Sequence, residues 1–215
     1  FLIITIKNPE TSTMFIDRFL ASTFSYNIET VLLFNKIDQI DNEEKKELNN
    51  FISIYKKAGY DCMEISGKKN INIDKLKKIM INKSCVFSGH SGVGKSTLIN
   101  KLDSSINIKT SPISESNLSG QHTTTFSEMY DLNFSSRIID TPGIKGFGLY
   151  DVKNNELRDF FKEFTLLRSC KFNNCLHLEE PGCEVKDRVS KGDISKSRYD
   201  NYVELLSEIN NNYRH

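Results

Sequence analysis

Gly89-His90-Ser91-Gly92-Val93-Gly94-Lys95-Ser96 decides the fold of this chain, because it matches the pattern G-x-x-x-x-G-K-[ST] at every fixed position. Glycines let successive backbone N–H groups point toward phosphate oxygens, Lys95 supplies a positive charge, and Ser96 offers a hydroxyl to Mg²⁺. An apolar, β-prone run at residues 84–88 precedes the loop, and a helical pattern that includes Thr97 follows it. The sequence therefore predicts a nucleotide phosphate site on a helix N-terminus. The alternative is a chance glycine-rich turn.

A second motif, Asp140-Thr141-Pro142-Gly143, follows an apolar run downstream of the phosphate loop. A carboxylate at the end of a strand beside a phosphate site can hold Mg²⁺ through water, and the Gly143 amide can approach the terminal phosphate. By itself the tetrapeptide would indicate only a turn. Its place after a phosphate loop indicates the second metal-side motif of a nucleotide site.

Between these motifs lies a polar run, Gly120-Gln121-His122-Thr123-Thr124-Thr125, whose composition suits a loop that becomes ordered with a ligand. A hydroxyl from this run, with Thr124 as the best candidate, could complete the Mg²⁺ shell beside Ser96 and Asp140. The residue after Gly143 is Ile144, which cannot orient a water, so His122 is the best candidate for the catalytic group. A solvated threonine-rich loop with an exposed histidine is the alternative.

The tetrapeptide Asn35-Lys36-Ile37-Asp38 follows a buried-strand run at residues 31–34. Ligands bind at the carboxyl ends of strands in α/β sheets, and a carboxylate at Asp38 can accept hydrogen bonds from guanine N1–H and N2–H₂, which adenine cannot offer. The motif therefore predicts selection of GTP over ATP. Downstream, Ser66-Gly67-Lys68 resembles the Ser-Ala-Lys element that supports the guanine base in such proteins.

The tetrapeptide Asn35–Asp38, here called the base reader, precedes the phosphate loop in the sequence. An ordinary guanine-nucleotide switch protein has the opposite order. The sequence therefore predicts a circularly permuted domain. Alternating strand and helix patterns, with helices expected over 13–22, 42–58 and 74–81, indicate βαβ units and a mostly parallel sheet. An apolar run at residues 1–6 reads as a buried strand.

Three of the five cysteines lie in the pattern C-x₄-C-x-H-x₅-C, formed by Cys170, Cys175, His177 and Cys183. Three thiolates and one imidazole are the donor set of a closed tetrahedral structural Zn²⁺ site. An odd number of cysteines does not suit a disulfide framework, and nothing in the sequence suggests secretion. A closing helix expected over 195–210, with an apolar stripe that includes Tyr202 and Leu206, completes a separate helical module.

The fold class we expect is therefore α/β: a circularly permuted P-loop GTPase domain at residues 1–152, followed by a small helical zinc-binding module at residues 153–215. No apolar run is long enough to span a membrane. The net charge is only +1, so composition predicts no global attraction to RNA. Lysines are concentrated between Lys68 and Lys83. They could form an RNA-binding patch or be ordinary solvated surface lysines, and the sequence leaves both alternatives open.

The order of base reader, support element, phosphate loop, threonine loop, Asp-x-x-Gly and cysteine cluster resembles the RsgA family, also called YjeQ. The resemblance implies hydrolysis of GTP to GDP with Mg²⁺ and one structural Zn²⁺, by a monomeric cytoplasmic factor in late assembly of the small (30S) ribosomal subunit. It also implies contact with rRNA and stimulation by that subunit. Family members carry an N-terminal OB-fold domain that this chain lacks, so we expect a piece of a longer protein. They usually have arginine where Gln121 stands here.

Three other functions remain open from the sequence. One is a permuted GTPase that serves large-subunit assembly, against which the C-terminal cysteine motif argues. Another is a zinc-stabilised RNA-binding protein in which the nucleotide only stabilises the fold. The third is an ATP-specific enzyme, which the base reader disfavours.

Overall fold

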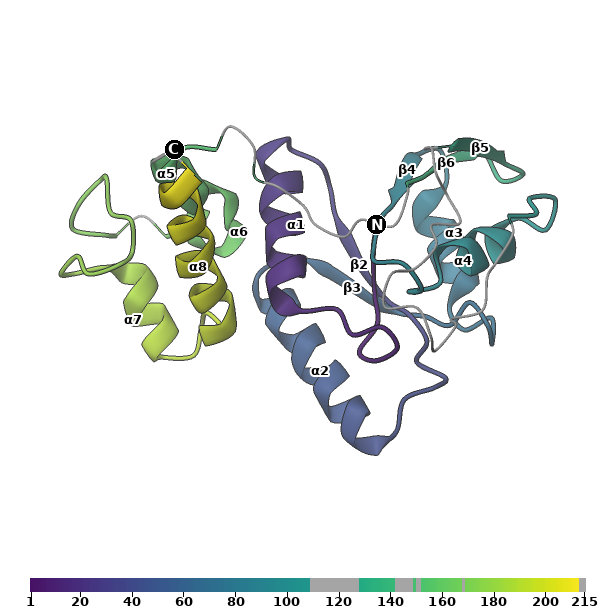
Figure 1. The fold of residues 1–215 in the computed structure, drawn as a ribbon, viewed down its shortest axis with the longest axis horizontal. Coiled ribbons are helices and arrows are strands. Elements are labelled where there is room, and N and C mark those ends of the chain that lie inside the picture. Colours follow the sequence, from purple (N-terminus) through teal and green to yellow (C-terminus); the bar gives the residue numbers. More distant parts are fainter. Residues whose placement is uncertain (109–127, 142–148, 150–151, 168, 213–215) are drawn as a thin grey trace. The chain divides into compact units, whose positions relative to one another are not determined.

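The computed structural model describes residues 1–215 except 109–127, 142–148, 150–151, 168 and 213–215 (Figure 1). The described chain forms two compact units, each with its own hydrophobic core. Unit 1 comprises the described residues of Phe1–Thr11, Val31–Asn49 and Cys62–Lys145, and unit 2 those of Ser12–Thr30, Asn50–Asp61 and Gly146–His215. Unit 2 thus includes segments from the first third of the chain. The division at residues 152 and 153 remains a sequence-based prediction.

The strands of unit 1 carry the motifs that the sequence singles out. One three-stranded sheet has the order β1 (Leu2–Ile4), β2 (Val31–Phe34), β3 (Asp61–Glu64), and another has the order β4 (Ser84–Phe87), β6 (Ser136–Asp140), β5 (Glu128–Leu132). Strand β1 is parallel to β2, and β4 is parallel to β6, whereas β5 is antiparallel to β6. A parallel bridge between Leu2 and Ser88 joins the two sheets through β1 and β4. The mostly parallel sheet predicted from sequence is confirmed.

Apolar side chains from helices and strands pack into one core in unit 1. Helix α3 (Ile73–Met80) contributes Ile73, Leu76 and Met80 at helical spacing, and α4 (Lys95–Leu102) contributes Leu98, Ile99 and Leu102. Figure 1 shows both helices beside β4 and β6. The packed face of β4 supplies Cys85 and Phe87, because alternate residues of a strand point to one side. This core fixes the strand that leads into the phosphate loop.

Helix α2 (Asn42–Lys57) begins where the sequence predicts, and Asp41 is its cap. The Asp41 carboxylate accepts hydrogen bonds from the amides of Glu43 and Glu44, both at 2.9 Å, and Glu44 Oε2 accepts one from the Asp41 amide at 3.0 Å. This reciprocal arrangement satisfies three N–H groups that a helix start otherwise leaves unpaired. It anchors α2 a few residues after the base reader.

The core of unit 2 is built by α1 (Thr13–Ser25), α5 (Asn154–Leu157), α6 (Lys162–Thr165), α7 (Glu184–Ser190) and α8 (Lys196–Asn212), with a 3-10 turn at Arg158–Phe160. In α8 the predicted apolar stripe is buried: Tyr202 is fully covered and Leu206 nearly so. Its partners include Phe161 and Phe164, whose rings lie 5.2 Å from that of Tyr202. The described helices include none with both the length and the apolarity that crossing a membrane requires.

An ion network lies inside unit 2. The Arg198 guanidinium donates to both carboxylate oxygens of Glu163, at 2.8 and 2.7 Å, and to Asp17 at 2.7 Å. Its carbon Cζ lies 4.7 Å from the centre of the Phe161 ring, and Asn201 donates to the second oxygen of Asp17 at 2.6 Å. Arg198 is 2 % exposed. The network therefore joins α1, α6 and α8 by hydrogen bonds shielded from water.

Candidate functional site: a nucleotide site and a metal centre

The phosphate loop connects β4 to α4 with backbone angles that only glycine adopts easily. Gly92 and Gly94 have φ of 81° and 98°, and Gly89 has φ of 150°. A Cβ at Gly89 would lie 2.6 Å from the Ile3 carbonyl oxygen, and one at Gly94 would lie 2.6 Å from Asn35 Nδ2. The glycines of the motif therefore also allow close contact with β1 and with the residue that follows β2.

Lys95 begins α4 and is 9 % exposed. Its Nζ donates to the carbonyls of Gly89 and His90, at 2.8 and 3.1 Å, so its charge lies within the loop. Burial lowers the pKa of Lys95, and the negative charge of Asp140 works against that effect. Asp140 is 1 % exposed at the end of β6, in register with Phe87 at the end of β4. The parallel pairing of these strands thus places a carboxylate beside the start of the phosphate loop, as the two motifs predict.

Asn35 joins the base reader to two other motifs. Its Nδ2 donates to the Val93 carbonyl at 2.8 Å, and its Oδ1 accepts from the Gly67 amide at 3.2 Å. Asn35 is 6 % exposed, so both bonds are protected from water. Gly67 is closely packed, because a Cβ there would lie 3.1 Å from Leu98 Cδ2. The amide of Asn35 therefore sets the distance between the phosphate loop and the base-support element.

Lys36 contacts the phosphate loop at Gly92. Its backbone has φ of 63°, and its Nζ donates to the carbonyls of Gly92 at 2.7 Å and Asn8 at 2.5 Å. Burial lowers its pKa, and the charge of Asp38 opposes that effect. The lysine links the residues after β1 to the phosphate loop through carbonyl groups.

Asp38 and Ser66 form the part of the site that can read a base. Ser66 is fully buried, and its Oγ donates to Asp38 Oδ1 at 2.5 Å and accepts from the Lys69 amide at 3.0 Å. Ile37, between Lys36 and Asp38, donates its amide to the Ile65 carbonyl at 3.4 Å. One oxygen of the Asp38 carboxylate is therefore fixed by Ser66, which orients the pair of acceptors that guanine N1–H and N2–H₂ require.

The remaining predicted nucleotide residues fall into two groups. Ser91, Ser96 and Thr97 lie in the phosphate loop or the first turn of α4, and Lys68 is exposed in the turn after Ser66. His122, Thr124 and Gly143 lie outside the described residues, so their roles stay predictions. 

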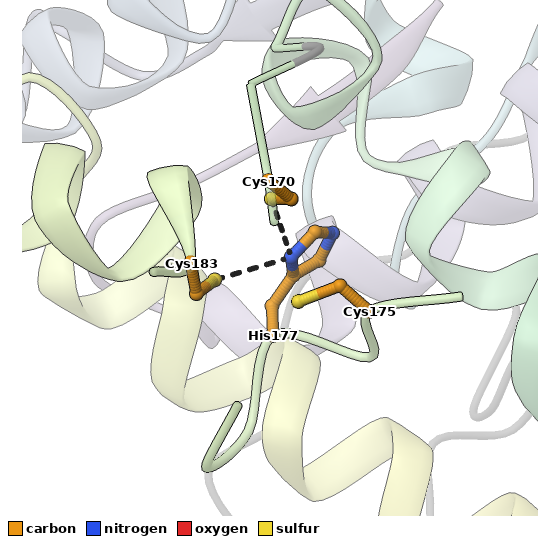
Figure 2. Close-up of side chains that lie close together, drawn as sticks. All are labelled: Cys170, Cys175, His177 and Cys183. Atoms are coloured by element: carbon orange, nitrogen blue, oxygen red, sulfur yellow. Dashed lines mark hydrogen bonds between the residues drawn. The ribbon is translucent and has the colours of Figure 1, made fainter. Parts of the chain in front are cut away.

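The cysteine cluster is assembled in unit 2. Figure 2 shows Cys170, Cys175 and Cys183 around the ring of His177, and their four donor atoms lie within 4.8 Å of one another. His177 Nδ1 is 3.3 Å from the Cys183 sulfur and 3.7 Å from the Cys170 sulfur. In a tetrahedral Zn²⁺ site with bonds of about 2.0–2.3 Å, donors lie roughly 3.5–4 Å apart. The donor set and its spacing fit one such ion, held through Nδ1 and three sulfurs.

Several residues that the motif does not include shape this cluster. Glu180 accepts the amides of Leu176 at 2.6 Å and Leu178 at 2.8 Å, on either side of His177, whose φ is 60°. From α8, the Tyr199 hydroxyl donates to the carbonyl of His177 at 2.7 Å. Sequence reasoning missed these contacts. The position of Glu180 between His177 and Cys183 could have been noticed, whereas the tyrosine contact depends on tertiary structure.

Burial disfavours the charged forms of the side chains in this cluster. It raises the pKa of Cys175 to about 12 and also raises that of Cys183, and it lowers the pKa of His177. Without a cation, burial therefore favours the neutral thiol form of Cys175 and Cys183. A divalent ion would favour the thiolate form, and its binding would then be coupled to the folding of this loop.

The RsgA GTPase family matches residues 1–150. The small ribosomal subunit biogenesis GTPase RsgA of Christiangramia forsetii is 51 % identical over 215 residues, which cover all of this chain and 68 % of that protein. The protein of the same name from Flavobacterium johnsoniae is also 51 % identical, and 66 % of it is covered. This chain belongs to the RsgA GTPase family. It spans about two thirds of the length of these curated relatives.

Solved structures support the family assignment and its permuted fold. YjeQ from Thermotoga maritima has a TM-score of 0.84 and 34 % identity, with 97 % of this chain and 69 % of that chain covered. YloQ, described as a circularly permuted GTPase, has a TM-score of 0.79 and 28 % identity, with 98 % and 68 % covered. The inverted motif order predicted from sequence is therefore a circular permutation, and the RsgA-family chain is a GTP hydrolase.

Proposed function

We propose that this RsgA-family protein hydrolyses GTP to GDP and phosphate as a maturation factor of the small ribosomal subunit, and that this subunit stimulates its turnover. The observation that carries the guanine specificity is the Asp38 carboxylate held by Ser66, with Asn35 bonded to both the support element and the phosphate loop. The printed names of the curated relatives support the ribosomal role.

Charge neutralisation and positioning supply most of the catalysis in phosphoryl transfer. Lys95 and the loop amides would bind the β- and γ-phosphates, and Ser96, Thr124 and Asp140 would hold Mg²⁺, which neutralises charge on the transferred group. His122 would orient the attacking water, because Ile144 cannot. Its substitution, His122→Ala, should lower subunit-stimulated turnover while GDP affinity is retained. Unchanged stimulated turnover would remove His122 from the mechanism.

Guanine recognition is tested by titrating GDP against ADP on wild type and on Asp38→Ala. The substitution removes two hydrogen bonds to a charged acceptor, each contributing about 1.5–3 kcal/mol, so GDP affinity should fall by at least about 100-fold. ADP affinity should remain weak in both proteins. Equal GDP affinity in the two proteins would contradict the assignment of Asp38.

The ribosomal role is tested by measuring multiple-turnover GTP hydrolysis with and without purified small subunits. Stimulation by small subunits, and none by large subunits, is the expected result. Binding to small subunits without turnover would instead favour an RNA-binding protein whose nucleotide only stabilises the fold. Pelleting with a non-hydrolysable GTP analogue and with GDP would show whether binding follows the nucleotide state. The protein itself we expect to be monomeric and cytoplasmic.

The metal we propose for the cluster of Cys170, Cys175, His177 and Cys183 is one structural Zn²⁺. Four protein donors leave no open position for a substrate, so the ion would stabilise the fold of the loop and take no part in hydrolysis. Elemental analysis should find one zinc per chain, and none after Cys175→Ala. Stoichiometric iron in place of zinc would contradict the choice of metal.

A further inference from the structure

Arg158 lies next to the cysteine cluster, although the metal motif does not include it. It begins the 3-10 turn Arg158–Phe160 in unit 2, and its Nη1 donates to the carbonyl of Cys175 at 2.8 Å. The carbonyl oxygen and the sulfur of one cysteine cannot lie far apart. This bond therefore brings the guanidinium close to one of the four metal donors that Figure 2 shows.

Side chains from outside the ligand loop hold three successive carbonyls of that loop. Arg158 holds the first, the Leu176 carbonyl accepts from the Tyr202 hydroxyl at 2.7 Å, and the His177 carbonyl accepts from the Tyr199 hydroxyl at 2.7 Å. Burial raises the pKa of both tyrosines, so they are neutral donors. Arginine is always protonated in proteins. Of these three donors, Arg158 alone brings a positive charge to the metal ligands.

The positive charge of Arg158 has little compensation from nearby carboxylates. Its Nε is buried and has no hydrogen-bond partner among the described residues. The Asp159 carboxylate lies 3.7 Å from Nε, and the side chains of Arg158 and Asp159 are 23 % and 64 % exposed. An ion pair that water reaches in this way contributes little. The Glu180 carboxylate is bonded to two backbone amides of the ligand loop.

A filled metal centre would supply the missing negative charge. Zn²⁺ with three thiolates and a neutral imidazole carries one net negative charge. The charge of Arg158 reaches these ligands, because burial and then the positive charge of Arg158 lower the pKa of His177. Charge complementarity between Arg158 and the cluster therefore arises when the ion is bound and the cysteines are thiolates. A group that interacts more favourably with the filled state than with the empty state strengthens binding.

We propose that Arg158 is the counter-ion of the metal centre: it stabilises the filled, negatively charged state and thereby raises the affinity of the cluster for Zn²⁺. This inference rests on the proposed structural Zn²⁺ at Cys170, Cys175, His177 and Cys183. A residue that only held the Cys175 carbonyl could be replaced by a neutral hydrogen-bond donor without loss of affinity. A counter-ion can be replaced only by another cation.

The test compares the Zn²⁺ affinity of wild type, Arg158→Gln, Arg158→Lys and a matched control, Arg188→Gln, by competition with a chromogenic chelator. Glutamine keeps a hydrogen-bond donor and loses the charge, whereas lysine keeps both. Arg188 lies in α7 of the same unit and pairs with Glu184 and Asp193, but its side chain is 44 % exposed. Its removal takes the same charge from the protein at a place that water reaches.

Arg158→Gln should weaken Zn²⁺ binding about 10–100-fold, the usual effect of changing a group that surrounds metal ligands. Arg158→Lys should retain most of the affinity, and Arg188→Gln all of it. Equal affinities of wild type and Arg158→Gln would overturn the proposal. Equal losses in Arg158→Gln and Arg158→Lys, or in Arg158→Gln and Arg188→Gln, would also overturn it.

Two further measurements separate a counter-ion from a residue that merely supports the fold. Co²⁺ bound to Arg158→Gln should show the wild-type visible absorption, because the donors are unchanged, but at higher Co²⁺ concentrations. At saturating Zn²⁺, hydrogen exchange of the α8 amides should return to the wild-type rate. An altered Co²⁺ spectrum, or exchange that stays fast at saturating Zn²⁺, would assign Arg158 to the fold and overturn the proposal.

Elemental analysis and GTP hydrolysis are measured on the same samples. Wild-type protein without zinc would contradict the metal centre itself and the role of Arg158 with it. One zinc per wild-type chain, together with unchanged affinity in Arg158→Gln, would contradict the role of Arg158 alone. GTP hydrolysis should be the same in all four proteins once they are loaded with Zn²⁺, since the ion takes no part in that reaction.

Discussion

Arg198→Ala should strongly destabilise unit 2, because Arg198 is the cation that three hydrogen bonds join to Asp17 and Glu163. The three side chains are 2 %, 0 % and 8 % exposed. Removing one partner from a buried ion pair typically costs about 3–5 kcal/mol, since the remaining charge stays buried. Two carboxylates are left here, and Phe161 also loses the guanidinium against its ring. We therefore expect the upper part of that range, a large share of a typical stability of about 5–15 kcal/mol.

Arg18→Ala is the matched control. Arg18 also joins α1 to α8, through two bonds to Glu208 at 2.6 and 2.7 Å, but these side chains are 24 % and 42 % exposed. The hydrogen-bond distances are similar, but the Arg18 pair is partly exposed and has one carboxylate, whereas Arg198 is buried and joins Asp17 of α1 and Glu163 of α6. The control should therefore lose no more than about 1 kcal/mol.

A chain with two compact units need not unfold in one step, so the stability of unit 2 must be measured separately. Hydrogen exchange of the α8 amides, followed by mass spectrometry, reports on unit 2 by itself. Thermal unfolding followed by circular dichroism gives a second measure. For about 200 residues, 1 kcal/mol corresponds to roughly 2–4 °C, so Arg198→Ala should lower the Tm by about 10 °C or more. Equal effects of Arg198→Ala and Arg18→Ala on exchange and on Tm would refute the reasoning.

The same substitution has a pH signature. Burial raises the pKa of Asp17, and the charge of Arg198 opposes that effect. In Arg198→Ala burial acts without this opposition, so the folded-state pKa rises further above the unfolded value. The destabilisation is therefore full at neutral pH and becomes smaller as pH falls through the raised folded-state pKa, because the buried carboxyl takes up a proton. A destabilisation that grows with acid would contradict this account.

Three other perturbations follow from the structure. Gly94→Ala should reduce GDP affinity more than tenfold in a fluorescent-nucleotide titration, since φ is 98° there and the added Cβ would lie 2.6 Å from Asn35 Nδ2. Gly192→Ala is the control: φ is 77°, so the backbone strain is similar, but nothing lies within 4 Å of the added Cβ. This control should leave GDP binding unchanged. Glu180→Ala should weaken metal affinity about 10–100-fold in a chelator competition, because it removes the acceptor of the Leu176 and Leu178 amides. Glu179→Ala, which changes an exposed neighbour, should leave metal affinity unchanged. Equal metal affinities of the two variants would contradict a positioning role for Glu180. Removing the metal with a chelator should speed hydrogen exchange in unit 2 and spare GDP binding, and loss of GDP binding would contradict this.

Sequence prediction was most accurate where function depends on residues close together in the chain. The cysteine motif spans residues 170–183, and its donors meet because a short loop has few ways to arrange them. Helix α2 also begins where its predicted range begins, and there the Asp41 cap acts on amides only two and three residues away. Helices α1 and α8 extend past their predicted ends, to Ser25 and Asn212, since boundaries depend on packing more than on local signals.

The sequence by itself predicted the chemistry of this protein: a phosphate loop, a guanine reader, a set of metal donors and, through their order, the permutation. These features are readable because each needs particular residue types at fixed local spacing. Tertiary structure decided what holds them together. Asn35 meets Val93 across 58 residues, and Arg198 meets Asp17 across 181, and no local pattern specifies such partners. Ser136 likewise meets Lys83 across 53 residues, because β4 pairs with β6.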